Sequence, residues 1–240
     1  MSPPLDPRLF ADAPRRDARF DVKEVWAEMT NLPVEDPRHR TEFLHRQMHE
    51  ELGGLEIAAR NLTDFPDADW EVRRAIARQC WDEARHVELF RRSCERRGGR
   101  VGEYPVLCFQ YRIITRIDSL AGRLAVQNRS FEAAGIDAIQ DGLRDARAAG
   151  ETDMLELLDT QLADEVQHVR YANTWVKRLV EGGGPRAVFE VARAVSQANE
   201  ALKIVAGDAV VTYPVAEDIR REAGFDAAEI EAVKQFPVRQ

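Results

Sequence analysis

The stretch Asp82-Glu83-Ala84-Arg85-His86-Val87 occurs a second time, with two differences, as Asp164-Glu165-Val166-Gln167-His168-Val169. Both copies read D-E-x-x-H-V. Residues three apart on an α-helix share a face, so the Glu and the His of each copy can reach one metal ion together. A single E-x-x-H is weak evidence because Glu is frequent in this chain, but a repeat that also keeps the Asp is a much rarer coincidence. The repeat therefore predicts two helices that carry equivalent parts of a metal site.

Two further stretches match each other and add one carboxylate to each half. They are Glu51-Leu52-Gly53-Gly54-Leu55-Glu56 and Glu132-Ala133-Ala134-Gly135-Ile136-Asp137, and both fit E-x-x-G-[LI]-[ED]. The first Glu of these stretches precedes the Glu of the following D-E-x-x-H-V motif by 32 residues in one half and by 33 in the other. Nearly equal spacing indicates a duplicated helix pair. The candidate metal ligands, which are also the candidate catalytic residues, are Glu51, Glu83, His86, Glu132, Glu165 and His168.

Long amphipathic segments carry these motifs, and Gly and Pro mark where they stop. We expect four long helices over residues 39–64, 67–97, 109–149 and 151–181. Shorter helices are expected over residues 22–29, 185–207, 215–222 and 226–236. The pattern predicts an all-α fold with a four-helix bundle, an N-terminal arm and additional C-terminal helices. Its three parts are an arm with a short helix (1–38), the bundle with the metal site (39–184) and a helical extension (185–240).

Composition and charge narrow the class of protein. The chain has 240 residues, of which 44% are hydrophobic and 32% charged, and this suits one helical globular core. Its formal net charge of -8 argues against nucleic acid as a partner, because clustered Lys and Arg hold phosphate. Cys80, Cys94 and Cys108 form no C-x-x-C pair, and no apolar run approaches the length of a membrane span. A cytoplasmic protein without a membrane segment is expected.

The residue types of the candidate ligands favour metal binding. Four carboxylates buried together repel one another, and two divalent cations make such a cluster formally neutral. Oxygen donors with one imidazole per ion suit iron or manganese, whereas zinc sites more often contain Cys or several His. Two helices that each give a Glu, and two that each give E-x-x-H, are the arrangement of di-iron and di-manganese bundles. We expect two Fe ions, with Mn or a mixed Mn/Fe pair as the alternative, and O2 as a co-substrate.

The motifs H-E-E-L-G-G-L-E, D-E-A-R-H-V, F-E-A-A-G-I-D and D-E-V-Q-H-V resemble those of the ferritin-like superfamily. That superfamily includes ferritins, rubrerythrins and bacterial multicomponent monooxygenases. The motifs are most similar to a bacterial ferritin-like family known as domain of unknown function 455. The resemblance covers about Glu42 to Leu179. It implies a ferritin-like bundle with two ions, the first held by the three ligands of the N-terminal half and the second by those of the C-terminal half. Glu83 and Glu165 are the favoured bridges between them.

The resemblance also implies a role for the Asp of each motif. In related di-iron bundles the Asp of one motif binds the His of the other, which here pairs Asp82 with His168 and Asp164 with His86. One position departs from a related class. Arylamine N-oxygenases of similar architecture have a third His one turn before the last E-x-x-H, and Gln161 stands there in this chain. N-oxidation nevertheless stays among the reactions considered.

Three choices stay open on the sequence. Glu50 competes with the residue after it as the first ligand, because the repeat alignment alone separates the two. Glu56 and Asp137 lie five residues beyond their proposed ligands and point elsewhere on the helix, where packing is the alternative to a role in the site. His45 and His49 are one turn apart but have no counterpart in the second half, so surface or structural roles are expected.

A centre of this kind supports three classes of function. The favoured one is an enzyme, a non-haem di-iron oxidoreductase that uses O2 to hydroxylate, desaturate or N-oxygenate a small organic substrate. The alternatives are a ferroxidase or iron-handling ferritin-like protein, and a structural metal-binding protein. About 55 residues follow Gly184, more than the one short helix that ends a cage-forming ferritin subunit, which favours the enzyme. The expected partners are the substrate, an electron-donor protein and a second copy in a homodimer, without nucleic acid or membrane.

Overall fold

A computed structural model describes residues 18–207 and 212–235 of the chain. These residues form two compact units. The first unit comprises residues 18–68, 76–116 and 200–207, and the second comprises residues 69–75, 117–199 and 212–235. Most of the N-terminal arm expected before Phe20 lies outside the described residues, and the division of the sequence into arm, bundle and extension stays a prediction.

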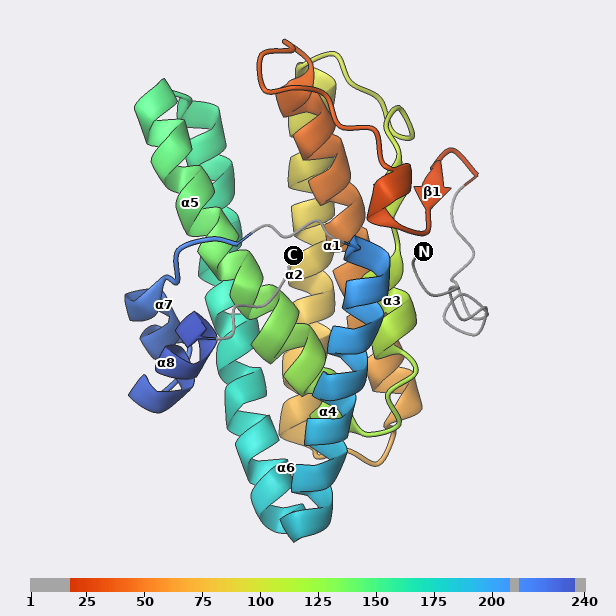
Figure 1. The fold of residues 1–240 in the computed structure, drawn as a ribbon, viewed down its shortest axis with the longest axis vertical. Helices are drawn as coiled ribbons and strands as arrows, with labels where there is room; N and C mark the ends of the chain where they lie inside the picture. Colours follow the sequence, from red (N-terminus) through yellow and green to blue (C-terminus); the bar gives the residue numbers. More distant parts are fainter. Residues whose placement is uncertain (1–17, 208–211, 236–240) are drawn as a thin grey trace. The chain divides into compact units, whose positions relative to one another are not determined.

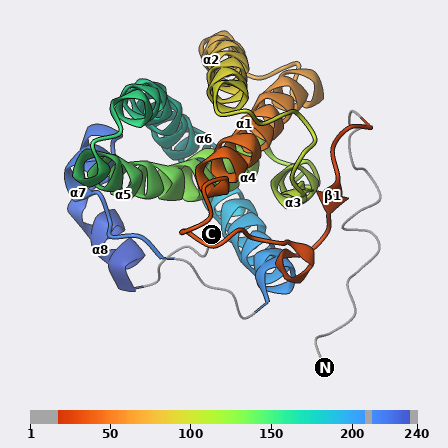
Figure 2. The ribbon, with the colours of Figure 1, turned by 90° about the horizontal axis from the view of Figure 1, so that it is seen from above.

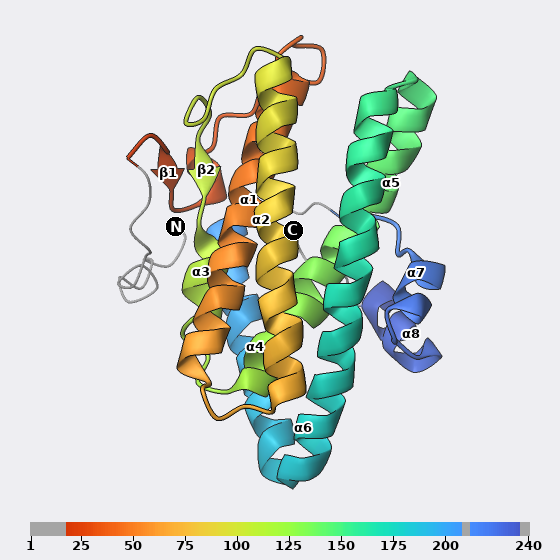
Figure 3. The same cartoon turned by 180° about the vertical axis from the view of Figure 1, so that it is seen from behind.

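Two long helices form the body of the first unit. Helix α1 covers His39–Asp64 and helix α2 covers Trp70–Arg96, of which residues 70–75 belong to the second unit. Figures 2 and 3 show the two helices side by side. Leu44, Ile57 and Phe90 on these helices are almost completely buried. Burial of each side chain of this size stabilises the fold by about 1.5–3 kcal/mol.

Short elements complete the first unit. Strand β1 (Val22–Lys23) pairs in parallel with strand β2 (Val106–Leu107), as Figure 3 shows, and a 3-10 turn, η2, covers Trp26–Glu28. Helix α3 (Phe109–Ile114) follows β2 directly.

The second unit contains the matching pair of helices. Helix α4 (Leu120–Val126) continues through a π-helical turn, η3 (Gln127–Glu132), into helix α5 (Ala133–Ala149). Most of helix α6 (Thr152–Ala206) follows, and Figures 1 and 2 show its first half beside α5. The helices approach closely at Gly142, where a Cβ would lie 3.2 Å from the Leu158 side chain. Two short helices, α7 (Glu217–Glu222) and α8 (Ala227–Gln235), end the described chain.

Most helix positions expected from the sequence are confirmed. Helix α1 has the expected bounds, and Gly150 ends α5 in the left-handed conformation that favours glycine, with φ of 70°. Helix α6 is interrupted at Gly184, with φ of 63° and ψ of -153°, so it consists of the two helices expected on either side of the Gly182 to Gly184 run. The chain reverses direction there (Figure 1). Helix α2 begins three residues later than expected, because the Asp69 side chain accepts a hydrogen bond from the Glu71 N–H and caps the first turn.

The short helix expected over residues 22–29 is wrong. The chain there forms β1 and the turn η2, and the Val106 N–H donates a hydrogen bond of 3.0 Å to the Asp21 carbonyl oxygen. The backbone is satisfied by a segment more than 80 residues away, and a local pattern does not reveal such a partner.

The single helix expected over residues 109–149 is also wrong. The chain leaves the helical conformation between α3 and α4, where Ser119 is extended (φ of -116°, ψ of 140°). Its hydroxyl oxygen accepts a hydrogen bond from the Gly122 N–H at 3.1 Å, so Ser119 is the N-cap of α4. The break therefore has a local cause, a capping serine.

A buried ion pair attaches α7 to α5 within the second unit. Arg220, which is 1% exposed, donates hydrogen bonds to both carboxylate oxygens of Asp137, the shortest at 2.7 Å, and to the Ala133 carbonyl oxygen at 2.9 Å. The Ala216 N–H donates to the same carboxylate at 2.9 Å. These contacts account for a buried arginine, whose charge is costly without a partner. Among the helices of the described residues, none has the length and apolar character needed to cross a bilayer.

Candidate metal centre

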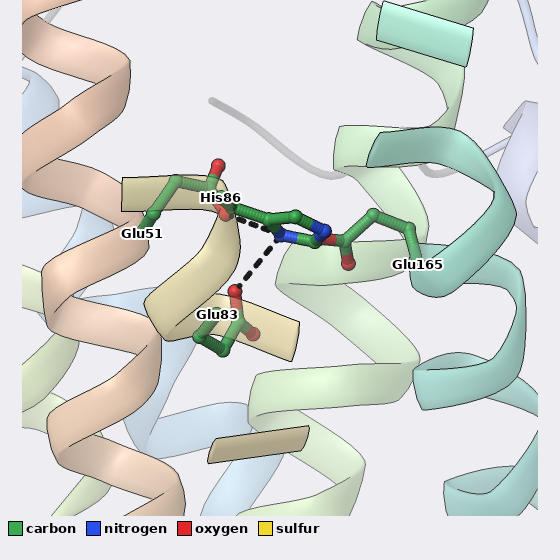
Figure 4. A group of neighbouring side chains, drawn as sticks. All are labelled: Glu51, Glu83, His86 and Glu165. Carbon is green, nitrogen blue, oxygen red and sulfur yellow. Dashed lines mark hydrogen bonds and ion pairs between the residues drawn. The ribbon is translucent and has the colours of Figure 1, made fainter. Parts of the chain in front are cut away.

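Helices α1 and α2 bring three predicted ligands of the first unit together. Glu51 comes from the middle of α1, and Glu83 and His86 come from one face of α2. The His86 Nδ1 atom lies 3.0 Å from Glu51 Oε2 and 3.4 Å from Glu83 Oε2. Dashed lines mark both contacts in Figure 4. All three residues are buried, His86 completely. We call Glu51, Glu83 and His86 the first half-site.

Glu50 and Glu51, between which the sequence leaves the choice of ligand open, have different surroundings. Glu51 is buried and its carboxylate contacts the His86 imidazole. Glu50 is exposed and accepts a hydrogen bond from the Gln47 side chain at 3.2 Å. The geometry therefore favours Glu51 as the ligand, as the repeat alignment predicts.

Two neighbours confine the Glu83 carboxylate. The Gln79 Nε2 atom donates a hydrogen bond of 2.9 Å to Glu83 Oε1. On another side lies Gly54, where a Cβ would be only 3.1 Å from both the Cδ and the Oε1 atoms of Glu83. The glycine in E-x-x-G thus leaves room for a carboxylate from the neighbouring helix, and the amide orients it.

The predicted ligands of the second unit form an equivalent group, which we call the second half-site. It consists of Glu132, Glu165 and His168. The His168 Nδ1 atom lies 3.5 Å from Glu165 Oε2, and a carboxylate oxygen of Glu132 lies within 4.8 Å of a nitrogen of the same ring. Glu165 and His168 are buried and Glu132 is half-buried. Glu132 directly precedes α5, and Glu165 and His168 lie on α6. Helices α5 and α6 pack side by side.

The π-helical turn η3 determines how Glu132 is held. Asn128 Nδ2 donates a hydrogen bond of 2.6 Å to one carboxylate oxygen of Glu132, and Gln127 Nε2 donates one of 3.0 Å to the other. In an α-helix, residues five apart do not share a face. The wider turn of a π-helix, with its i→i+5 hydrogen bonds, brings Gln127 and Glu132 to the same side. Both donors are buried.

The donor sets fit a metal ion. Two atoms bound to one ion lie no further apart than two bond lengths, roughly 4.4 Å for bonds of about 2.2 Å, and the distances of 3.0, 3.4 and 3.5 Å from imidazole to carboxylate meet this limit. In each half-site two carboxylates accompany one imidazole, so even a protonated imidazole leaves an excess of buried negative charge. The described residues thus contain buried Glu and His clusters that could hold metal.

The remaining acidic residues of the motifs have different surroundings. Asp82 is buried and accepts a hydrogen bond from Arg78 Nε at 3.1 Å, and Asp164 is buried as well. Their pairing with His168 and His86 stays a prediction. Asp137 is the anchor for Arg220, so packing is its observed role. Glu56 is half-buried on α1.

Two histidines of α1 outside the candidate site, and the carboxamide side chains beside it, differ from what the sequence predicts. His45 and His49 are buried, so the surface alternative for them is wrong, and the Gly102 N–H donates a hydrogen bond of 2.9 Å to His45 Nε2. The carboxamide residues that contact the candidate ligands were not anticipated. For Gln79 a signal was available, because a glutamine stands four residues before the Glu in each motif. For Asn128 and Gln127 no pattern indicated the π-helical turn.

The fold and the two half-sites define an all-α protein of the ferritin-like class. The chain belongs to the family described as "Protein of unknown function (DUF455)", whose model matches residues 4–231. This match extends well beyond the motifs on which the resemblance was based. No curated protein matches the chain.

A solved structure confirms the fold class. It is described as "Protein 19 with aldehyde deformylating oxidase activity from Synechococcus". The similarity covers 82% of this chain and 94% of that chain, with a TM-score of 0.54 and 15% sequence identity. At this identity the likeness establishes a shared fold.

Proposed function

We propose that the two half-sites together hold two divalent metal ions, iron in the first place, and that the protein is an O2-dependent oxidoreductase acting on a small organic substrate. The observation that carries the proposal is the duplicated, buried pair of Glu and E-x-x-H groups, each with carboxylates directed at an imidazole. Glu51, Glu83 and His86 would hold one ion and Glu132, Glu165 and His168 the other.

Charge supports two ions in preference to none. The six ligands contribute four carboxylates and two neutral imidazoles, and two divalent ions balance these four negative charges. Buried carboxylates without such balance repel one another and take up protons. The donor set, rich in oxygen with one imidazole per ion, suits iron or manganese better than zinc.

The residues of the chain supply position and environment for the chemistry. A bound pair of iron ions supplies the capacity to transfer electrons to O2. Glu83 is oriented by Gln79 and by the space at Gly54, and Glu132 is oriented by two carboxamides, so both carboxylates are held before metal arrives. The burial of both imidazoles keeps bulk water away from the donors.

The solved structure with the similar fold supports the proposal that this protein is an oxidase that acts on a small substrate. That protein is described as having aldehyde deformylating oxidase activity. We extend to this chain only the reaction class, an O2-dependent oxidation, with hydroxylation, desaturation and N-oxygenation as the candidate reactions. The chain has no C-x-x-C pair with which to build an iron-sulfur module, so we propose that reducing electrons come from a separate donor protein.

Anaerobic titration with Fe(II), followed by admission of air, tests the proposal. We expect about two Fe per chain, with oxygen consumption that depends on a reductant and increases with a suitable organic substrate. The matched control is the double variant His86→Ala with His168→Ala, which should bind no iron tightly while its far-UV circular dichroism stays helical.

Three outcomes would contradict the proposal. Equal iron content in the wild type and the double variant would show that the two imidazoles do not bind the metal. Uptake far above two Fe per chain with mineral growth would indicate iron storage. Two bound ions that consume no O2 with any reductant would indicate a structural metal site.

A further inference from the structure

The repeat of the metal-binding motifs is longer than D-E-x-x-H-V. Gln79 stands four residues before Glu83, and Gln161 stands four residues before Glu165. Both copies therefore read Q-x-x-D-E-x-x-H-V. Residues four apart on a helix are neighbours on one face, so each glutamine lies beside the glutamate of its own motif.

Both glutamines are buried, although neither is a proposed ligand. Gln79 is 2% exposed and Gln161 is 5% exposed. A carboxamide buried in a helical core is costly unless its polar atoms are bonded. A glutamine kept in both copies of a repeat therefore needs a polar function, because an apolar residue would fill the same space more cheaply.

In the first unit the glutamine contacts the glutamate of its own motif. Gln79 Nε2 donates to Glu83 Oε1 at 2.9 Å, while Glu83 Oε2 lies 3.4 Å from His86 Nδ1. One oxygen of the carboxylate is thus held by the amide, and the other is directed at the imidazole. An ionised carboxylate only accepts hydrogen bonds, so the donor end of a carboxamide is the suitable neutral partner.

We infer that Gln79 and Gln161 are a matched pair of positioning residues, each of which orients the glutamate one turn later on its helix for metal binding. The inference rests on the proposed function, because it assigns a role in the same two-ion site. It predicts a hydrogen bond from the Gln161 amide to Glu165, equivalent to the one observed between Gln79 and Glu83. Residues of this kind raise metal affinity by holding a ligand in place before the ion binds.

Binding of Co(II) to the full-length protein under anaerobic conditions tests the inference. The variants are Gln79→Met and Gln161→Met, in which a side chain of similar volume lacks the N–H donor, and Gln79→Glu, which replaces the donor by a second carboxylate. Stoichiometry, affinity and the visible absorption bands of Co(II) are measured, and circular dichroism checks that each variant is helical. The matched control is Gln167→Met, because Gln167 lies inside the second motif but is exposed, its oxygen accepting a hydrogen bond from Arg170.

We expect each of the two Met variants to bind one of its two Co(II) ions about 10–100-fold more weakly and to show shifted absorption bands. Gln79→Glu should weaken binding as well, since it lacks the amide donor. This variant provides the test if a Met variant does not fold. Gln167→Met should match the wild type in affinity and spectrum. A purely structural role for the glutamines would change stability and leave the bands of the bound metal in place.

Several results would overturn the inference. If both Met variants kept the affinity and spectrum of the wild type, the glutamines would not be positioning residues, while the proposed two-ion site would be unaffected. An effect confined to Gln79 would overturn the pairing, and an equal effect of Gln167→Met would show that the response is not specific. If the wild type itself bound no Co(II), the proposed function and this inference would fail together.

Discussion

The two half-sites derive from one repeated pattern but hold their first glutamate differently. In the first half-site Glu51 directs an oxygen at His86 from a regular α-helix, 3.0 Å away. In the second, Glu132 ends a π-helical turn and both of its oxygens accept hydrogen bonds from carboxamides. The glycine one turn later also differs, being crowded at Gly54 and open at Gly135. Equivalent candidate ligands can thus have different surroundings.

The largest expected difference between the halves concerns Asp137, whose counterpart in the first half is Glu56. Asp137→Ala leaves the buried guanidinium of Arg220 without its carboxylate, so we expect a loss of about 3–5 kcal/mol in the free energy of unfolding. Glu56→Ala, at a half-buried position, should cost about 1 kcal/mol or less. Urea unfolding of both variants measures the difference. Equal losses would mean that the anchor to α7 does not stabilise the second unit.

The imidazoles test whether each half holds its own ion. His86→Ala and His168→Ala should each weaken the binding of one ion by at least about 100-fold, or about 2.7 kcal/mol, and leave the other bound. Anaerobic titration with metal analysis of the desalted protein measures this. His39→Gln is the control, because the His39 ring contacts the Leu32 carbonyl oxygen and is not a proposed ligand. Retention of two tightly bound ions in either Ala variant would exclude that imidazole as a ligand.

A pH effect specific to the first half should arise from His45, which has no histidine counterpart in residues 109–149. Burial lowers the pKa of the His45 imidazole from 6.5 to about 4, with Arg46 lowering it further and Glu103 opposing the shift. The unfolded chain therefore takes up this proton first as the pH falls. Stability from the neutral ring is complete above pH 6.5 and is lost towards pH 4, by on the order of 2 kcal/mol.

The measurement for His45 is unfolding by urea at pH 7 and at pH 4.5. His45→Gln, whose amide oxygen can accept the Gly102 N–H, should lose less stability over this range than the wild type does. An identical pH dependence in the two proteins would show that other groups carry it.

The smallest effects come from the paired glycines. Gly135→Ala should raise the free energy of unfolding by about 1 kcal/mol, because Ala favours the helix and a Cβ there meets nothing within 4 Å. Gly54→Ala gains the same helix preference but presses on the Glu83 carboxylate, so we expect metal binding about 10-fold weaker. Parallel metal titration and unfolding of both variants check this. Equal metal affinity in the two variants would mean that Glu83 can move away from a Cβ at position 54 without any effect on metal binding.

Features that repeat or stop locally were predictable from the sequence. The D-E-x-x-H-V copies and the E-x-x-G stretches placed all six candidate ligands on the helices that bear them, and glycines marked the ends of α5 and the first half of α6. The pairing of β1 with β2 was not predictable, because its hydrogen bonds join residues far apart in the chain. The carboxamide contacts to Glu132 depend on a π-helical turn, which has no recognisable composition.

The break in the helix before α4 was only partly predictable from the sequence. Ser119 stands at a position where a cap was recognisable, but the apolar periodicity across residues 109–149 favoured one continuous helix. Here a strong local stop outweighs a weaker periodic pattern.

The turn η3 is also a structural difference between the two copies of the repeat. A hydrogen bond that spans five residues encloses one residue more than the bond of an ordinary α-helix, so such a turn accommodates a one-residue insertion while the helix continues on both sides. A π-helical turn at this place therefore allows a difference in helix length upstream of Glu132 while the candidate ligand keeps its position. Deleting a single residue from this turn would rotate everything before it by about one residue, roughly 100°, relative to α5.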